Sequence, residues 1–112
     1  MVKSPLNSEN IKWGNNCDAW TLLESESLVV IQKRMPPQTT EDTHFHSKAQ
    51  QVFYIVEGIA TVKIEENLIT VKAGESIHIP NLTIHSIVNR SNEYMSFLVI
   101  SEPSAINDRI NV

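Results

Sequence analysis

Two histidines separated by one residue, His44 and His46, are the first residues whose spacing indicates chemistry. A β-strand places side chains i and i+2 on the same face, so both imidazoles can reach one ion. Gln51 follows at the start of an apolar strand, and His85 comes soon after the turn expected at Pro80. Three imidazole nitrogens and one amide oxygen form a suitable ligand set for one divalent transition metal, and these ligand types admit Zn, Ni, Mn, Fe, Co or Cu.

The segments that carry these residues predict an all-β fold. Short runs rich in Val, Ile, Thr, Phe and Tyr recur between breakers, and no segment keeps a helical apolar period over three turns. The expected strands are Trp20-Leu23, Leu28-Met35, Thr43-His46, Gln51-Val56, Ala60-Glu65, Leu68-Val71, Ser76-Ile79, His85-Asn89 and Met95-Ser101. So many short strands in a small domain favour a sandwich or a closed antiparallel barrel. Between the fifth and sixth of these strands the sequence predicts a hairpin turn at Glu66-Asn67.

Side-chain alternation also suggests which residues line a substrate pocket. Phe53 and Ile55 share the face of Gln51 by period two, so we expect them inside the fold, near the metal. In the strand Leu28-Met35 both faces carry apolar groups, and periodicity alone does not decide which face is inward. We predict that Gln32 and Arg34, rather than Lys33, face the substrate.

The remaining candidates are interpreted as structural. His78 is expected to be an ordinary strand side chain, and Trp13 and Trp20 to pack the N-terminal arm or a dimer contact. Asp108 and Arg109 lie in a tail, residues 103–112, that we expect to drape over the barrel. We interpret them as a solvated charge pair, with closure of the barrel mouth as the less favoured alternative.

Composition limits the class of protein. The chain has 112 residues, 41% of them hydrophobic and 20% charged, which predicts one soluble globular domain over 1–112 with a core at about 18–102. Its formal net charge of -4 argues against nucleic acid and anionic membrane as partners. A single cysteine, Cys17, and the lack of a visible secretory signal lead us to expect a cytoplasmic protein.

The spacing of the metal candidates resembles that of the cupin family. Its first motif, a His-x-His pair followed by Glu and then Gly, is matched by the residues His44, His46, Gln51 and Gly58. Its second motif, with Gly, Pro, His and Asn, is matched by Gly74, Pro80, His85 and Asn89. The resemblance covers roughly residues 38–89 and implies a cupin double-stranded β-helix, a jelly-roll barrel of antiparallel strands.

Three positions depart from the cupin pattern. Gln38 and Leu82 stand where the motifs usually have Gly, so two turns must form without the freedom of glycine at positive φ. Gln51 replaces the usual Glu ligand, which leaves a divalent ion with about one more unit of positive charge. Such a site is a stronger Lewis acid and is suited to anionic or enolate-forming ligands.

The resemblance admits three functions. We favour a Lewis-acid enzyme acting on a small oxygenated substrate, such as a sugar derivative or a dicarbonyl, because cupins with Gln at this position include tautomerases of unsaturated uronates and polyketide cyclases. A metal-dependent dioxygenase is the first alternative, and a non-enzymatic module that binds or senses a small ligand is the second. In each case we expect a homodimer, formed through an edge strand and the Trp-bearing N-terminal arm.

Overall fold

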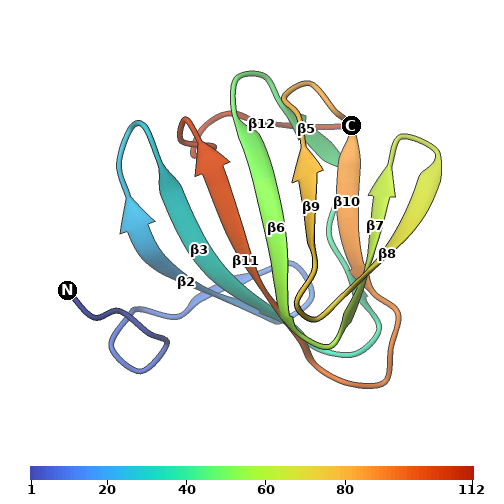
Figure 1. Cartoon of the computed structure of the whole chain (residues 1–112), viewed down its shortest axis with the longest axis horizontal. Helices are drawn as coiled ribbons and strands as arrows, with labels where there is room; N and C mark the ends of the chain where they lie inside the picture. The colour runs from blue at the N-terminus through green and yellow to red at the C-terminus, as the bar shows by residue number, and fades with distance from the viewer.

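The computed structural model describes residues 1–112 as strands joined by turns and loops (Figure 1). The strands are β1 (Ile11–Trp13), β2 (Cys17–Glu24), β3 (Val29–Met35), β4 (Thr39–Thr40), β5 (His44–His46), β6 (Gln50–Glu57), β7 (Ile59–Ile64), β8 (Asn67–Lys72), β9 (Ser76–Ile79), β10 (His85–Asn89), β11 (Met95–Glu102) and β12 (Arg109–Asn111). The chain contains no helix with the length and hydropathy that a membrane span requires. The predicted all-β class is confirmed.

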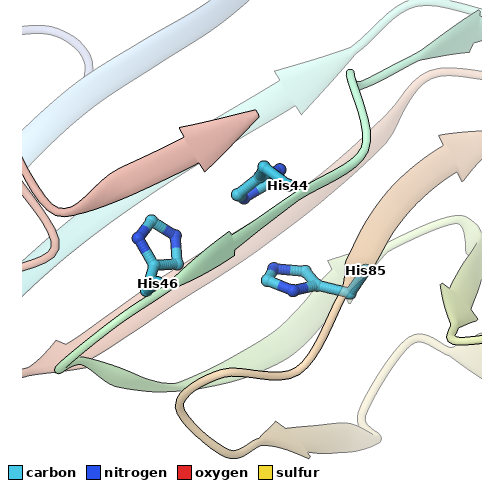
Figure 2. A group of neighbouring side chains, drawn as sticks. All are labelled: His44, His46 and His85. Carbon is cyan, nitrogen blue, oxygen red and sulfur yellow. The ribbon is translucent and has the colours of Figure 1, made fainter. Parts of the chain in front are cut away.

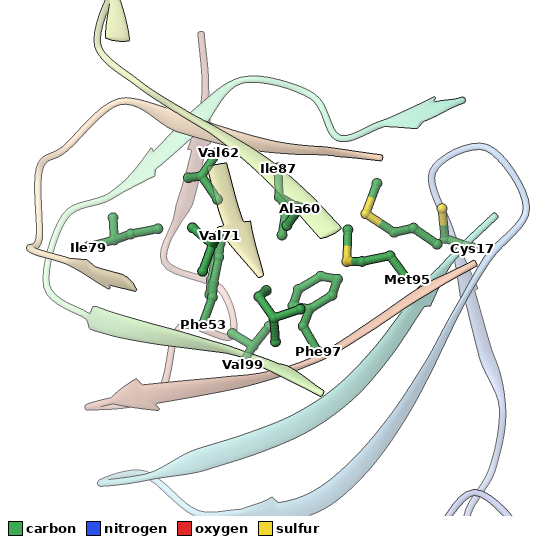
Figure 3. Packing of buried hydrophobic residues seen from close by; sticks show 12 residues of the cluster. Cys17, Phe53, Ala60, Val62, Val71, Ile79, Ile87, Met95, Phe97 and Val99 are labelled. Atoms are coloured by element: carbon green, nitrogen blue, oxygen red, sulfur yellow. The ribbon is translucent and has the colours of Figure 1, made fainter. Parts of the chain in front are cut away.

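The strands form two sheets, and every pairing is antiparallel. One sheet has the order β1-β2-β3-β11-β6-β9, and the other has the order β12-β5-β10-β7-β8 with β4 also paired to β10. Alternate side chains of both sheets enclose a cluster of 12 buried residues, shown in Figure 3, which includes Phe53, Ile55, Ile87 and Phe97. This arrangement is the predicted jelly roll.

All nine predicted strands are present, with ends that differ by at most one residue except at the start of β2, which begins three residues earlier than predicted. The hairpin turn is one residue earlier than predicted: Ile64 pairs with Asn67, so Glu65 and Glu66 form the turn. The short strands β1, β4 and β12 were not predicted, because two or three residues show no alternation.

The C-terminal tail is integrated into a sheet, and the prediction of a draped tail is wrong. Strand β12 pairs with β5, which places Arg109 opposite His46. The carboxylate of Asp108 accepts hydrogen bonds from Ser47 Oγ and from the backbone N–H groups of Lys48 and Ala49. Asp108 is therefore the anchor of the tail and not half of a solvated charge pair.

Both departures from the glycine pattern adopt the conformation that glycine favours. Gln38 has φ 59° and Leu82 has φ 64°. The backbone N–H of Leu82 also donates to the carbonyl of His46 at 2.7 Å, which joins this turn to the strand that carries two of the metal candidates. The turn geometry is thus retained at the cost of a non-glycine residue in the left-handed region.

Candidate metal centre and pocket

Three of the predicted metal ligands meet in the folded chain. His44 and His46 lie on β5, and His85 lies on the adjacent β10 directly opposite His44 (Figure 2). One ring nitrogen from each of the three lies within 4.8 Å of the others. All three side chains are buried, so the cluster faces the interior of the jelly roll rather than solvent.

Hydrogen bonds fix the protonation of two of these rings. Nδ1 of His44 donates to the carbonyl of Asp42, and Nδ1 of His85 donates to the carbonyl of Thr83, each at 2.8 Å. A carbonyl only accepts, so the proton is on Nδ1 and the Nε2 lone pair is free to bind a metal. Nε2 of His85 and Nδ1 of His46 are both buried without a hydrogen-bond partner.

Gln51 presents its amide in a similar way. Its Nε2 donates to Ser101 Oγ at 2.9 Å, whereas its Oε1 is buried without any partner. Buried polar atoms rarely remain unpaired, because each unmade hydrogen bond destabilises the fold. Unpaired lone pairs on two histidines and an amide oxygen are compatible with a transition-metal site in which all four predicted residues are ligands.

Burial keeps the imidazoles neutral. Desolvation lowers the pKa of His44 and of His46 to about 4, and it also lowers the pKa of His85. The neighbouring imidazoles act in the same direction, since each disfavours a proton on the next. At neutral pH all three rings are therefore in the form that binds a metal.

A cavity of about 260 Å³ opens beside the cluster. His44, His46 and Gln51 are in its wall, together with Phe53, whose ring centroid is 5.9 Å from that of His85. Ile55 is not at the cavity as predicted: it is fully buried in the hydrophobic core. Ile55 lies four residues after Gln51 on β6, and so sits further along the strand from the cavity residues Gln51 and Phe53.

The predicted inward face of β3 is wrong. Val29, Ile31 and Lys33 line the cavity, so Gln32 and Arg34 lie on the opposite face of the strand. The exposed Arg34 places its NH2 group 3.2 Å from the carboxylate of Asp18 and its guanidinium 4.7 Å from the ring centroid of Tyr94. The outer face offers this ion pair and an aromatic partner, which the sequence of β3 alone does not show.

Several polar cavity residues were not among the predicted site residues, and they include Lys33, Glu41, Ser101 and Arg109. Glu41 is buried, accepts a hydrogen bond from the backbone N–H of Ile87 at 3.3 Å, and lies 3.7 Å from NH1 of Arg109. A glutamate three residues before His44 gave one available signal. For Arg109 the less favoured interpretation, closure of the barrel mouth, was nearer the structure, and its position depends on the pairing of β12 with β5.

With this geometry established, the chain can be assigned to a family. The family model described as "Cupin domain" matches residues 32–101, which is most of the chain, and the protein therefore belongs to the cupin family. An uncharacterized protein of Methanocaldococcus jannaschii is 33% identical over 60 residues. That alignment covers 54% of this chain and 48% of the relative, so the chain matches about half the length of that protein.

Solved structures share the fold at low sequence identity. A predicted oxalate decarboxylase from Thermotoga maritima superposes with a TM-score of 0.85 at 19% identity, over 93% of this chain and 100% of that chain. The polyketide cyclase RemF from Streptomyces resistomycificus gives 0.78 at 19% identity, over 93% and 81% of the two chains. At such identities the likeness shows the fold and leaves the reaction open.

Proposed function

We propose that this cupin is a metal-dependent enzyme in which His44, His46, His85 and Gln51 hold one divalent transition metal. The observation that carries the proposal is the buried, unpaired Oε1 of Gln51, whose amide is oriented by its hydrogen bond to Ser101. When bound, such an ion would supply Lewis-acid stabilisation of negative charge on a small oxygenated substrate. The substrate class we favour is a sugar derivative or a dicarbonyl, and the reaction an isomerisation, tautomerisation or elimination.

The other groups in the cavity wall suit such a reaction. Glu41 is the one carboxylate there, and we assign it the transfer of a proton to or from the substrate. Val29, Ile31 and Phe97 give the wall an apolar surface that excludes water and strengthens electrostatic interactions within the cavity. The wall thus combines a proton carrier and an apolar surface beside the candidate metal site.

The first experiment is elemental analysis of protein purified without a metal-affinity tag. We expect close to one transition-metal ion per chain, and loss of that ion in the His46→Ala variant. His78→Ala is the matched control, because His78 is exposed and its Nε2 is paired with Gln50 Oε1. A wild-type protein that fails to bind any first-row divalent ion under titration would contradict the proposal.

The second experiment tests catalysis. In D₂O, the metal-loaded protein should accelerate exchange of the central C–H protons of acetylacetone and related dicarbonyls, followed by proton NMR. Glu41→Gln should slow the exchange by about 10²-fold or more with unchanged metal content. If the C–H protons exchange no faster with the metal-loaded protein than with the free metal ion, Lewis-acid catalysis by the protein is refuted.

The two alternatives give different results in the same samples. A dioxygenase would consume oxygen with a diol substrate when loaded with iron, nickel or copper. A ligand sensor would bind without turnover in any metal form. We also propose that the chain forms a homodimer through an edge strand and the N-terminal arm, which light scattering at micromolar concentration tests. Trp13 is only partly buried against the hydrophobic core of its own chain, so part of its ring remains for such a contact.

A further inference from the structure

Lys33 is a half-buried lysine in the cavity wall that forms no ion pair. It lies on β3, on the same face as Val29 and Ile31, and no carboxylate forms an ion pair with it. Its Nζ lies 4.4 Å from the ring centroid of Trp13, a cation–π contact. Burial lowers the pKa of Lys33, and the charge of Glu41 opposes that shift without forming an ion pair with it. The amine of Lys33 has therefore lost hydration without gaining a direct anionic contact.

The second cation of the cavity is already engaged. Arg109 donates from Nε to Asn111 Oδ1 at 2.8 Å and from NH2 to the carbonyl of Asp42 at 3.2 Å. Its NH1 lies 3.7 Å from Glu41, so the charges of Arg109 and Glu41 largely offset each other. Lys33 is left as the positive charge available to a ligand.

We propose that the cavity binds a small carboxylate, whose carboxylate group pairs with the ammonium of Lys33 while oxygen atoms at its other end face His44, His46 and Gln51. The inference rests on the proposed function in one respect, that the oxygenated end of the ligand faces the metal site. What it adds is that the other end of the ligand is a carboxylate and that Lys33 recognises it. Lys33 is therefore a determinant of substrate specificity and not a catalytic group.

The surroundings of Lys33 favour a carboxylate over a phosphate. One ammonium matches a single negative charge, whereas phosphate sites usually add backbone N–H groups from a glycine-rich loop or a helix N-terminus. No glycine lines the cavity, and the fold has no helix. The volume of about 260 Å³ is below the range of about 300–1,000 Å³ typical of drug-sized ligands. The apolar side chains of Ile31, Phe53 and Phe97 suit a short carbon frame between the two polar ends.

Matched ligands test the proposal. Zinc-loaded protein is titrated with 3,4-dihydroxybenzoate and with 3,4-dihydroxybenzamide, which share the chelating diol but differ in charge. The corresponding phenylacetate and phenylacetamide test a longer spacing. For at least one spacing the acid should bind about tenfold or more tightly than the amide, as expected for a charged contact at a partly buried site. Lys33→Met should remove the difference, Lys33→Arg should keep most of it, and the exposed control Lys72→Met should leave it unchanged.

Trp13 provides a direct reading of the same contact. The ring of Trp13 contacts Lys33, so a bound carboxylate should change the fluorescence of Trp13. The Trp20→Phe variant removes the only other tryptophan, so the signal comes from Trp13 alone. Without metal, benzoate should still produce this change, and benzamide should not. If the protein does not bind metal but still shows this fluorescence change, the proposed metal-dependent function is rejected and the carboxylate site stands. Equal affinity for acid and amide at both spacings, or an acid preference that survives Lys33→Met, overturns the carboxylate site.

Discussion

Gln51 and Ser101 are directly opposite each other on β6 and β11, and the side-chain amide of Gln51 donates to the hydroxyl of Ser101 at 2.9 Å. This bond orients the amide so that Oε1, and not Nε2, is the free atom. Ser101→Ala should therefore lower metal affinity by about 10- to 100-fold, the usual effect of losing a group that positions a ligand. Isothermal titration with Zn²⁺ measures the change.

Ser96→Ala is the control for that experiment, because Ser96 lies on the same strand and outside the cavity. It should leave metal affinity unchanged. If Ser101→Ala binds zinc as tightly as wild type, the amide is held by other contacts and the hydrogen bond has no positioning role.

The low pKa values of His44 and His46 predict how stability depends on pH. Both are about 4 in the folded protein, against 6.5 in the unfolded chain, so the unfolded state takes up protons first. The stabilisation is complete above about pH 6.5 and is lost as the pH falls toward 4. Urea unfolding in the presence of a chelator should show this decline.

The loss of stability between about pH 6.5 and 4 is specific to these histidines. The lowered pKa values of Asp18 and Asp108 remove stability only below about pH 3.8, their ordinary value. His78→Ala should keep the slope, since His78 is exposed. A free energy of unfolding that stays constant between about pH 6.5 and 4.5 would mean that the imidazoles are not desolvated as the structure has them.

Leu82→Gly should stabilise the protein. Leu82 has φ 64° and its side chain is 62% exposed, so little packing is lost with the side chain. The left-handed conformation costs a non-glycine residue about 1–2 kcal/mol, partly offset by the greater freedom of glycine when unfolded. We expect a gain of about 0.5–1 kcal/mol, seen as a Tm a few degrees higher.

Leu82→Ala is the matched control, because it shortens the side chain but keeps Cβ and should bring no gain. Gln38→Gly should gain less than Leu82→Gly, since the Gln38 side chain donates to the carbonyls of Arg90 and Ser91. No rise in Tm for Leu82→Gly would show that the turn is not strained.

Asp108→Asn should loosen the C-terminal strand. Although burial opposes its charge, hydrogen bonds from Ser47, Ala49 and Lys48 lower the pKa of Asp108 to about 2, so the carboxylate is charged in the native protein. An amide has one acceptor oxygen where the carboxylate has two, and we expect a loss of about 1–2 kcal/mol. Hydrogen exchange should report faster exchange of the Val112 amide, which donates to Thr43.

Asp42→Asn removes the same charge from an exposed position near the same strand and should leave both measurements unchanged. Unaltered protection of the β12 amides in Asp108→Asn would show that strand pairing alone holds the tail.

The sequence was informative where spacing reflects local geometry and uninformative where the fold joins distant segments. His44 and His46 were predictable because strand periodicity sets their common face, and His85 and Gln51 because the family motif has fixed spacing. The inward orientation of Lys33 was not predictable, because apolar residues on both faces of β3 leave the inward face undetermined by periodicity. Arg109 depends on the pairing of β12 with β5, which joins segments more than sixty residues apart. Glu41 depends on its backbone and side-chain hydrogen bonds to Ile87 of β10, which is 46 residues away.

The last prediction concerns the amide that replaces a carboxylate at position 51. Gln51→Glu adds a negative ligand to an otherwise neutral set, so it should tighten divalent metal binding and weaken the binding of anionic ligands, each by about tenfold or more. The geometry should persist, because the Ser101 hydroxyl can donate to one carboxylate oxygen and leave the other for the ion.

Titration of both variants with Zn²⁺, then with small carboxylates and diketones, measures the two affinities separately. If Gln51 keeps the site electropositive, metal and anion affinities move in opposite directions. If Gln51 instead marks a site that has lost its metal, wild type purifies empty, Gln51→Glu restores the ion, and there is no ligand affinity to lose. Equal anion affinity in two fully metallated variants would show that the charge of residue 51 does not control ligand binding.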